Sequence, residues 1–131
     1  MKAWSILVVD DEPSILALVS RALQKRGHTI ATAGDGVEAG RVVSSQAFDL
    51  VLTDLLMPDK DGIQVIAELR RKFPAVKIIA MSGGGHIPQD QYLKIAKGLG
   101  AHALLDKPFT IDQLYAVVDS VLAPEGAGAP S

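Results

Sequence analysis

Short, strongly apolar segments alternate along the chain with longer segments whose apolar residues recur at helical spacing. The segments at residues 6–9, 50–52 and 78–81 contain no polar residue, which is typical of strands covered by helices on both faces. We predict that these three lie at the centre of a sheet. The alternation favours an α/β domain with a parallel sheet. The five predicted strands cover residues 4–9, 28–33, 48–53, 76–81 and 101–105.

The segments between the predicted strands begin and end with residues that favour helix boundaries. Pro13 suits the first position of a helix, and Gly27 suits its end. The spacing of apolar residues predicts that this helix packs through Ile15, Leu18, Val19, Ala22 and Leu23. The other predicted helices cover residues 35–45, 61–73, 88–97 and 111–122, of which 88–97 is the least periodic.

Length and composition favour a single domain. The 131 residues are 48% hydrophobic, which is enough for one buried core. The 13 basic and 15 acidic residues give a formal charge of −2 without a basic block, which argues against direct nucleic-acid binding. The absence of cysteine excludes a disulfide and a thiolate metal site.

The two ends of the chain add expectations about location and boundaries. The first apolar run stops at Asp10, too soon for a signal peptide, and no run approaches the roughly 20 apolar residues of a membrane span. We therefore expect a cytoplasmic protein without membrane contact. Residues 124–131 contain no large apolar residue, so we expect one domain over residues 1–123, followed by a flexible tail or the start of a linker.

Polar residues follow directly after four of the predicted strands. In a doubly wound sheet, ligands bind outside the carboxyl ends of the strands. We therefore expect acidic, hydroxyl and basic side chains to converge at one edge of the sheet. These residues are Asp10, Asp11 and Glu12 after the first strand, Asp54 after the third, Ser82 after the fourth, and Asp106 and Lys107 after the fifth.

This set of side chains favours metal-dependent phosphoryl transfer. Clustered carboxylates repel one another unless a divalent cation compensates their charge, and their oxygens select Mg²⁺ or Mn²⁺ rather than zinc. Lys107 can pair with an oxygen of an incoming phosphoryl group, and Ser82 can donate a hydrogen bond to another. An aspartate beside the metal can attack the phosphorus and form an acyl phosphate.

Four motifs in this order resemble the receiver domain of response regulators in bacterial two-component signalling. They are ILVVDDEPS, LVLTDLLMPDKDG, IIAMSGGG and LLDKPF, and the resemblance covers about residues 5–122. The resemblance, in particular to chemotaxis regulators, implies a doubly wound parallel sheet of five strands. It further implies the flavodoxin-like strand order 2-1-3-4-5, with helices on both faces.

The resemblance also implies a role for each matching residue. Asp54 would be phosphorylated, Lys107 would contact the phosphoryl group, and Ser82 would move toward that group on activation. The cofactor would be Mg²⁺, bound directly by Asp11 with Asp10 beside it. The implied metal ligands are Asp10, Asp11, Asp54 and the backbone carbonyl of Leu56.

One position departs from the family pattern. Many receivers carry Tyr or Phe three residues before the lysine, where this chain has Leu104. Because leucine has no phenolic hydroxyl, we expect the coupling to the partner surface to be altered, or to be carried by another group such as Tyr92 or His102. The family also often has a cis peptide bond between Lys107 and Pro108.

The implied function is that of a signalling module rather than a metabolic enzyme. Such a module receives its phosphoryl group from a histidine kinase or a histidine phosphotransfer protein, and catalyses only its own Mg²⁺-dependent phosphorylation and dephosphorylation. An unknown downstream protein would bind the changed surface, and formation of a homodimer is left open.

Two other functions remain as alternatives. One is a metal-dependent phosphatase with an aspartyl-phosphate intermediate, although the haloacid dehalogenase type has an acid two residues after the nucleophile, where this chain has Leu56. The other is a degenerate receiver that binds a partner without being phosphorylated.

Some of these residues also have simpler structural interpretations. Asp10 and Asp11 alone could cap the first helix, and only their combination with Asp54 and Lys107 favours a metal site. Three histidines are scattered without ligand spacing, and we interpret them as surface or edge residues. They are His28, His86 and His102.

Overall fold

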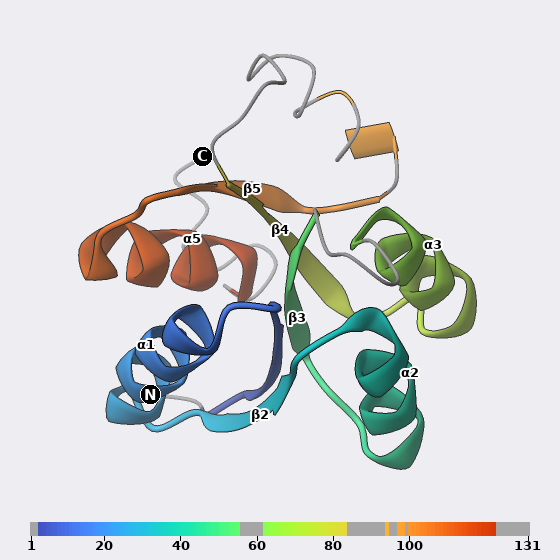
Figure 1. Ribbon diagram of the computed structural model, residues 1–131, viewed down its shortest axis with the longest axis horizontal. Helices are drawn as coiled ribbons and strands as arrows, with labels where there is room; N and C mark the ends of the chain where they lie inside the picture. Colours follow the sequence, from blue (N-terminus) through green and yellow to red (C-terminus); the bar gives the residue numbers. More distant parts are fainter. Residues whose placement is uncertain (1–2, 56–61, 84–93, 95–96, 99, 123–131) are drawn as a thin grey trace.

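The structure is a computed structural model that describes residues 3–55, 62–83, 94, 97–98 and 100–122. Strands and helices alternate along it, as the sequence pattern predicts (Figure 1). The helix predicted at residues 88–97 lies largely outside the described residues. The strands are β1 (Ser5–Val9), β2 (Thr29–Ala33), β3 (Leu50–Asp54), β4 (Lys77–Gly83) and β5 (Ala103–Lys107). The helices are α1 (Pro13–Lys25), α2 (Gly36–Ser45), α3 (Gly62–Lys72) and α5 (Ile111–Leu122).

The five strands form one parallel sheet in the order β2-β1-β3-β4-β5. This order confirms the expected α/β class and the implied order 2-1-3-4-5. Strands β1, β3 and β4 occupy the centre, as their uninterrupted apolar segments predict. Every residue of β3 is buried, because this strand has neighbours on both edges and helices over both faces.

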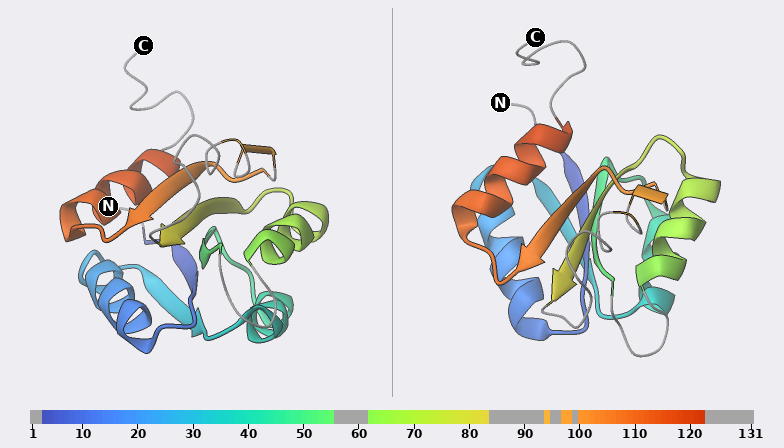
Figure 2. Two further views of the ribbon diagram at one scale, coloured as in Figure 1. Left: turned by 45° about the horizontal axis from the view of Figure 1, so that its top comes forward. Right: turned by 90° about the horizontal axis from the view of Figure 1, so that it is seen from above.

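The helices cover the sheet in two layers. Helices α1 and α5 lie on one face, and α2 and α3 lie on the other (Figures 1 and 2). Successive side chains of a strand point to opposite faces, so each strand contributes to two cores. Ile6 and Val8 pack on the side of α1 and α5, whereas Leu7 and Val9 pack on the side of α2 and α3. We call these the α1/α5 side and the α2/α3 side.

Local chemistry sets the helix boundaries near the predicted positions. Pro13 opens α1, and Gly27 follows its end with a φ of 88°, a backbone conformation that favours glycine. Asp35 caps α2, because its carboxylate accepts a hydrogen bond from the Glu38 N–H at 2.8 Å. The Glu38 carboxylate in turn accepts from the Gly34 N–H at 3.0 Å, so two otherwise unpaired donors are satisfied reciprocally.

The packed face of α1 is narrower than predicted. Val19, Ala22 and Leu23 are buried and Ile15 is partly buried, as expected. Leu18 is 43% exposed, so the prediction that it packs was wrong. At about 3.6 residues per turn, Leu18 lies at the flank of the stripe formed by the other four. Within the described residues, no helix combines the length and apolar character needed to span a membrane.

Two histidines complete the hydrogen bonding of strands at the amino ends of the sheet. The Trp4 N–H donates to His28 Nδ1 at 3.1 Å, and the Ile78 N–H donates to His102 Nδ1 at 3.1 Å. Each histidine directly precedes an edge strand. Its ring nitrogen accepts a main-chain N–H at the amino end of the neighbouring central strand. The prediction that these are edge residues is confirmed for both, whereas His86 lies outside the described residues.

Candidate functional site

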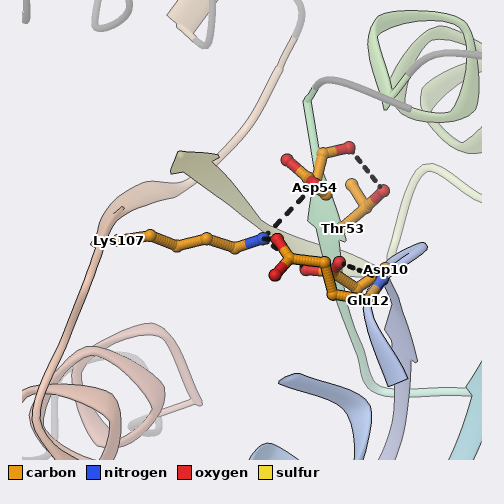
Figure 3. A network of polar contacts seen from close by, with 5 residues as sticks. All are labelled: Asp10, Glu12, Thr53, Asp54 and Lys107. Carbon is orange, nitrogen blue, oxygen red and sulfur yellow. Dashed lines mark hydrogen bonds and ion pairs between the residues drawn. The ribbon is translucent and has the colours of Figure 1, made fainter. Parts of the chain in front are cut away.

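The carboxyl ends of three strands bring charged side chains together at one edge of the sheet, which we call the carboxyl rim (Figure 3). Asp10 follows β1, Asp54 ends β3 and Lys107 ends β5. Lys107 Nζ lies 2.6 Å from Asp10 Oδ2 and 3.3 Å from Asp54 Oδ2. Asp10 is 0% exposed and Asp54 is 5% exposed. Two buried carboxylates therefore contact a single ammonium group.

The charge of Lys107 is stabilised by these carboxylates. Burial on its own would lower the pKa of Lys107, but the hydrogen bonds and charges of Asp10 and Asp54 outweigh it and raise the pKa above its ordinary value. Lys107 is therefore protonated at neutral pH. The rim gathers two buried carboxylates around one ammonium, so further positive charge is favourable there.

Asp10 is fixed by contacts to both of its carboxylate oxygens. Oδ2 contacts Lys107, and Oδ1 accepts a hydrogen bond from the Glu12 N–H at 2.9 Å. The Asp10 N–H donates to the carbonyl of Ala33 in β2 at 3.1 Å. The residue at the N-cap of α1 is Glu12, which makes no side-chain cap hydrogen bond. The interpretation of Asp10 as the cap of this helix was therefore wrong.

The residues after β1 offer oxygen ligands to a cation. Carboxylate oxygens of Asp10, Asp11 and Glu12 all lie within 4.8 Å of one another, and Asp11 and Glu12 are exposed. A hard, anionic set of oxygens fits Mg²⁺. Glu12 also lies 3.5 Å from Lys107 Nζ, a contact that the sequence analysis did not assign. The carbonyl of Leu56, the other implied ligand, lies outside the described residues.

The hydroxyl of Ser82 has its own partner, Asp106, on the α2/α3 side of the sheet. Its hydroxyl donates a hydrogen bond to Asp106 Oδ1 at 2.7 Å, and the two residues are direct partners in the β4–β5 register. The preceding residues, Met81 and Leu105, belong to the core on the α1/α5 side. Because side chains alternate, Ser82 and Asp106 lie on the α2/α3 side. From sequence, Asp106 is expected at this rim but without a partner.

The end of β5 also shows how the chain departs from the family pattern. Leu104 is partly buried and packs against the core on the α2/α3 side. His102 Nδ1 accepts from the Ile78 N–H at the amino end of β4, so the suggestion that His102 replaces the usual aromatic residue gains no support from this contact and stays a prediction. Tyr92 lies outside the described residues. The peptide bond between Lys107 and Pro108 is cis, as the resemblance implies.

The structure thus divides the predicted site residues into groups. It brings three charged residues into direct contact, places Asp11 beside them, and bonds Ser82 to a residue without a predicted role. Alternation along the strands places Ser82 and Asp106 on one face of the sheet, but only the register between β4 and β5 pairs them. The three residues in contact are Asp10, Asp54 and Lys107.

Comparison with known proteins identifies the family. A family model described as the response regulator receiver domain matches residues 6–119. The chain belongs to the response regulator receiver family. This receiver domain is 35% identical over 121 residues to the transcriptional regulatory protein GlrR of Escherichia coli K12, covering 92% of this chain and 27% of GlrR. It is 40% identical over 113 residues to the transcriptional regulatory protein TcrA of Mycobacterium tuberculosis, covering 85% of this chain and 43% of TcrA.

Solved structures agree with this assignment. The receiver domain superposes on the chemotaxis response regulator CheY4 of Vibrio cholerae with a TM-score of 0.84 and 29% identity, covering 92% of this chain and 100% of CheY4. In contrast, the chain spans less than half the length of GlrR and TcrA. The comparisons therefore show a receiver domain, which in those two relatives is one part of a longer protein.

Proposed function

We propose that the chain is a phosphoacceptor module in which Asp54 takes a phosphoryl group from a histidine kinase or a histidine phosphotransfer protein. The observation that carries this proposal is the contact of Lys107 Nζ with both Asp10 and Asp54. It places the carboxylate of Asp54 beside a cation and beside an acidic group that fits Mg²⁺. Membership of the receiver family supports the same role.

Each side chain of the rim would contribute one part of the reaction. The Asp54 carboxylate attacks the phosphorus, and the leaving group is the donor's imidazole or, with a small donor such as acetyl phosphate, a carboxylate. Lys107 pairs with a phosphoryl oxygen, and Ser82 donates to another once it leaves its resting partner. Asp10, Asp11, Asp54 and the Leu56 carbonyl would hold Mg²⁺, which would neutralise negative charge at the transferring group.

The output of such a module is a changed protein surface. We propose that a downstream protein reads the phosphorylated state by contact, because the formal charge of −2 and the lack of a basic block in the sequence do not favour nucleic-acid binding. We further propose that the domain extends over residues 1–123, with residues 124–131 as a tail or the start of a linker. The family match over residues 6–119 supports these limits.

Labelling with acetyl phosphate and Mg²⁺ tests this function. We expect about one phosphoryl group per chain, followed by slow decay, because the acyl phosphate is the end product rather than a turnover intermediate. Many turnovers on a small phosphate ester would support the phosphatase alternative instead. A chain that folds and binds Mg²⁺ but takes no label would support the degenerate receiver.

The substitution Asp54→Asn tests the site. Asparagine has nearly the same shape but no nucleophilic carboxylate, so we expect labelling to disappear while the amide spectrum stays that of a folded domain. Asp49→Asn is the matched control, because it removes a carboxylate at the other end of the sheet. Labelling at full yield in Asp54→Asn would refute the assignment.

A further inference from the structure

The hydroxyl of Ser82 is engaged in a contact that competes with the proposed reaction. Ser82 is 3% exposed, and its Oγ lies 2.7 Å from Asp106 Oδ1, in the distance range of a short hydrogen bond to a carboxylate. The register of β4 with β5 places the two residues directly opposite each other. The bond therefore joins two strand ends that the sheet already holds side by side.

A serine hydroxyl has a single proton to donate. Ser82 cannot donate it to the Asp106 carboxylate and to a phosphoryl oxygen at the same time. Alternation places Asp54, two residues after Leu52, and Lys107, two residues after Leu105, on the α1/α5 side, whereas Asp106 lies on the α2/α3 side with Leu104. Donation to Asp106 therefore directs the hydroxyl away from Asp54.

We propose that Asp106 is a positioning residue that stabilises the resting state by holding the Ser82 hydroxyl. The inference rests on the proposed phosphorylation of Asp54. Phosphorylation at Asp54 then has to break the bond between Ser82 and Asp106 before Ser82 can contact the phosphoryl group. The stronger this bond is, the more of the free energy gained from phosphorylation at Asp54 is needed to break it.

The bond between Ser82 and Asp106 matters in this chain because the neighbouring Leu104 cannot bond to Ser82. Leu104 packs against the core on the α2/α3 side and carries no hydrogen-bonding group. It therefore cannot compete for the Ser82 hydroxyl. Asp106, two residues further along the same face of β5, supplies the polar contact to Ser82 at this edge of the sheet.

The first test measures the affinity of the Mg²⁺-loaded chain for beryllofluoride, a phosphoryl mimic, from amide chemical shifts. We expect Asp106→Ala to bind it about tenfold more tightly than the wild-type chain, which corresponds to one competing hydrogen bond of about 1.4 kcal/mol. Asp106→Asn loses the same charge but keeps an acceptor oxygen, so we expect its affinity to stay within about twofold of wild type. Asp112→Ala, an exposed carboxylate at the start of α5, is the control for loss of charge elsewhere.

The second test asks whether the effect passes through Ser82. We expect Ser82→Ala to weaken beryllofluoride binding, and we expect Asp106→Ala to have no further effect in the Ser82→Ala background. An equal gain from Asp106→Ala in both backgrounds would mean that its charge acts directly on the anion, and would overturn the proposal. Equal affinity of Asp106→Ala and wild type would overturn it as well.

The third test separates this proposal from the proposed function. Urea unfolding of the unphosphorylated wild-type chain, both single variants and the double variant measures the coupling between Ser82 and Asp106 without any phosphoryl donor. We expect a favourable coupling, and its absence would refute the hydrogen bond itself. A coupling that persists in a chain that binds no beryllofluoride and takes no label would refute the function of Asp54, and with it the switching role, but not the bond.

Discussion

At the amino ends of the strands, three polar side chains accept hydrogen bonds from main-chain N–H groups. At the carboxyl ends, apart from the bond of Asp10 Oδ1 with the Glu12 N–H, the polar side chains of the rim mainly contact one another. His28, Asp49 and His102 each accept from a main-chain N–H, at 3.1, 2.9 and 3.1 Å respectively. The carboxyl rim instead pairs a lysine with two carboxylates and a serine with a third. At one end of the sheet, polar side chains therefore satisfy main-chain N–H groups, and at the other end they mainly contact other side chains.

The difference shows which end can respond to a ligand. A main-chain N–H is fixed by the strand, so a side chain that satisfies it has one arrangement and stabilises the fold. Side-chain partners can exchange, because an ammonium or a hydroxyl can turn from a carboxylate to a phosphoryl oxygen. Charges that are buried together also interact strongly with any added charge. Changes at the carboxyl rim should therefore alter ligand binding, and changes at the amino ends should alter stability alone.

The substitution Lys107→Ala, at the carboxyl rim, is expected to have the largest effect. The side chains of Lys107 and Asp10 are 10% and 0% exposed, and removing one member of a buried ion pair leaves the other charge uncompensated. We expect a loss of about 3 kcal/mol in the free energy of unfolding without Mg²⁺. We expect Mg²⁺ to bind and to restore part of this stability, because it binds only the folded state. Urea unfolding at several Mg²⁺ concentrations measures both effects.

The same variant should separate labelling from signalling. Without Lys107 the phosphoryl group loses its contact with β5, so we expect Asp54 to accept label while the amide shifts of β5 and α5 no longer change. Lys107→Arg is the matched control, since it keeps the charge at this position. A Lys107→Ala chain as stable as wild type, with no response to Mg²⁺, would contradict the view that the buried carboxylates of the carboxyl rim need compensating positive charge.

A smaller effect is expected at the amino ends from Asp49→Ala. The Asp49 carboxylate accepts from the Ser5 N–H at 2.9 Å, and the loss of one exposed hydrogen bond costs about 1 kcal/mol or less. We expect labelling of Asp54 and beryllofluoride affinity to stay unchanged. Asp49→Asn keeps an acceptor and should recover most of the lost stability. Altered labelling in Asp49→Ala would contradict the expectation that changes at the amino ends of the strands alter stability alone.

The fold was largely predictable because its central strands are buried on both faces. Uninterrupted apolar segments marked β1, β3 and β4, and the order of strands and helices left few arrangements of a parallel sheet. The prediction failed at Leu18, which is apolar but lies at the flank of the packed stripe of α1. Hydrophobic spacing defines the direction of a helix face well and its width poorly.

The candidate site was predictable only as far as strand ends determine it. Asp10, Asp54 and Lys107 follow strands, and parallel topology brings such positions together. The contacts of Glu12 with Lys107 and of Ser82 with Asp106 depend on side-chain reach and on the register between β4 and β5. A shift of one residue in register would place Asp106 beside a different partner, so the hydrophobic pattern alone could not assign these contacts.

The smallest expected effect is a loss of stability in mild acid that originates at the amino ends. Burial is the largest cause that lowers the pKa of both His28 and His102 below 6.5. At His28 the charge of Asp119 opposes this shift and that of Arg26 adds to it. At His102 the charges of Lys77 and Arg70 add to it, and the hydrogen bond with the Ile78 backbone opposes it. A protonated Nδ1 could no longer accept the main-chain N–H.

Because the folded pKa values are lowered, the unfolded chain takes up protons first as the pH falls. The stability from these two residues is complete above about pH 6.5 and decreases as the pH falls through the lowered values of the folded state. The variant His28→Asn/His102→Asn keeps an acceptor oxygen near each Nδ1 but does not titrate. We expect its urea midpoint to fall less than that of wild type between about pH 7.5 and about pH 5.5. Equal losses in both chains would show that the acid sensitivity arises elsewhere, and the carboxylates of the carboxyl rim would then be the next groups to test.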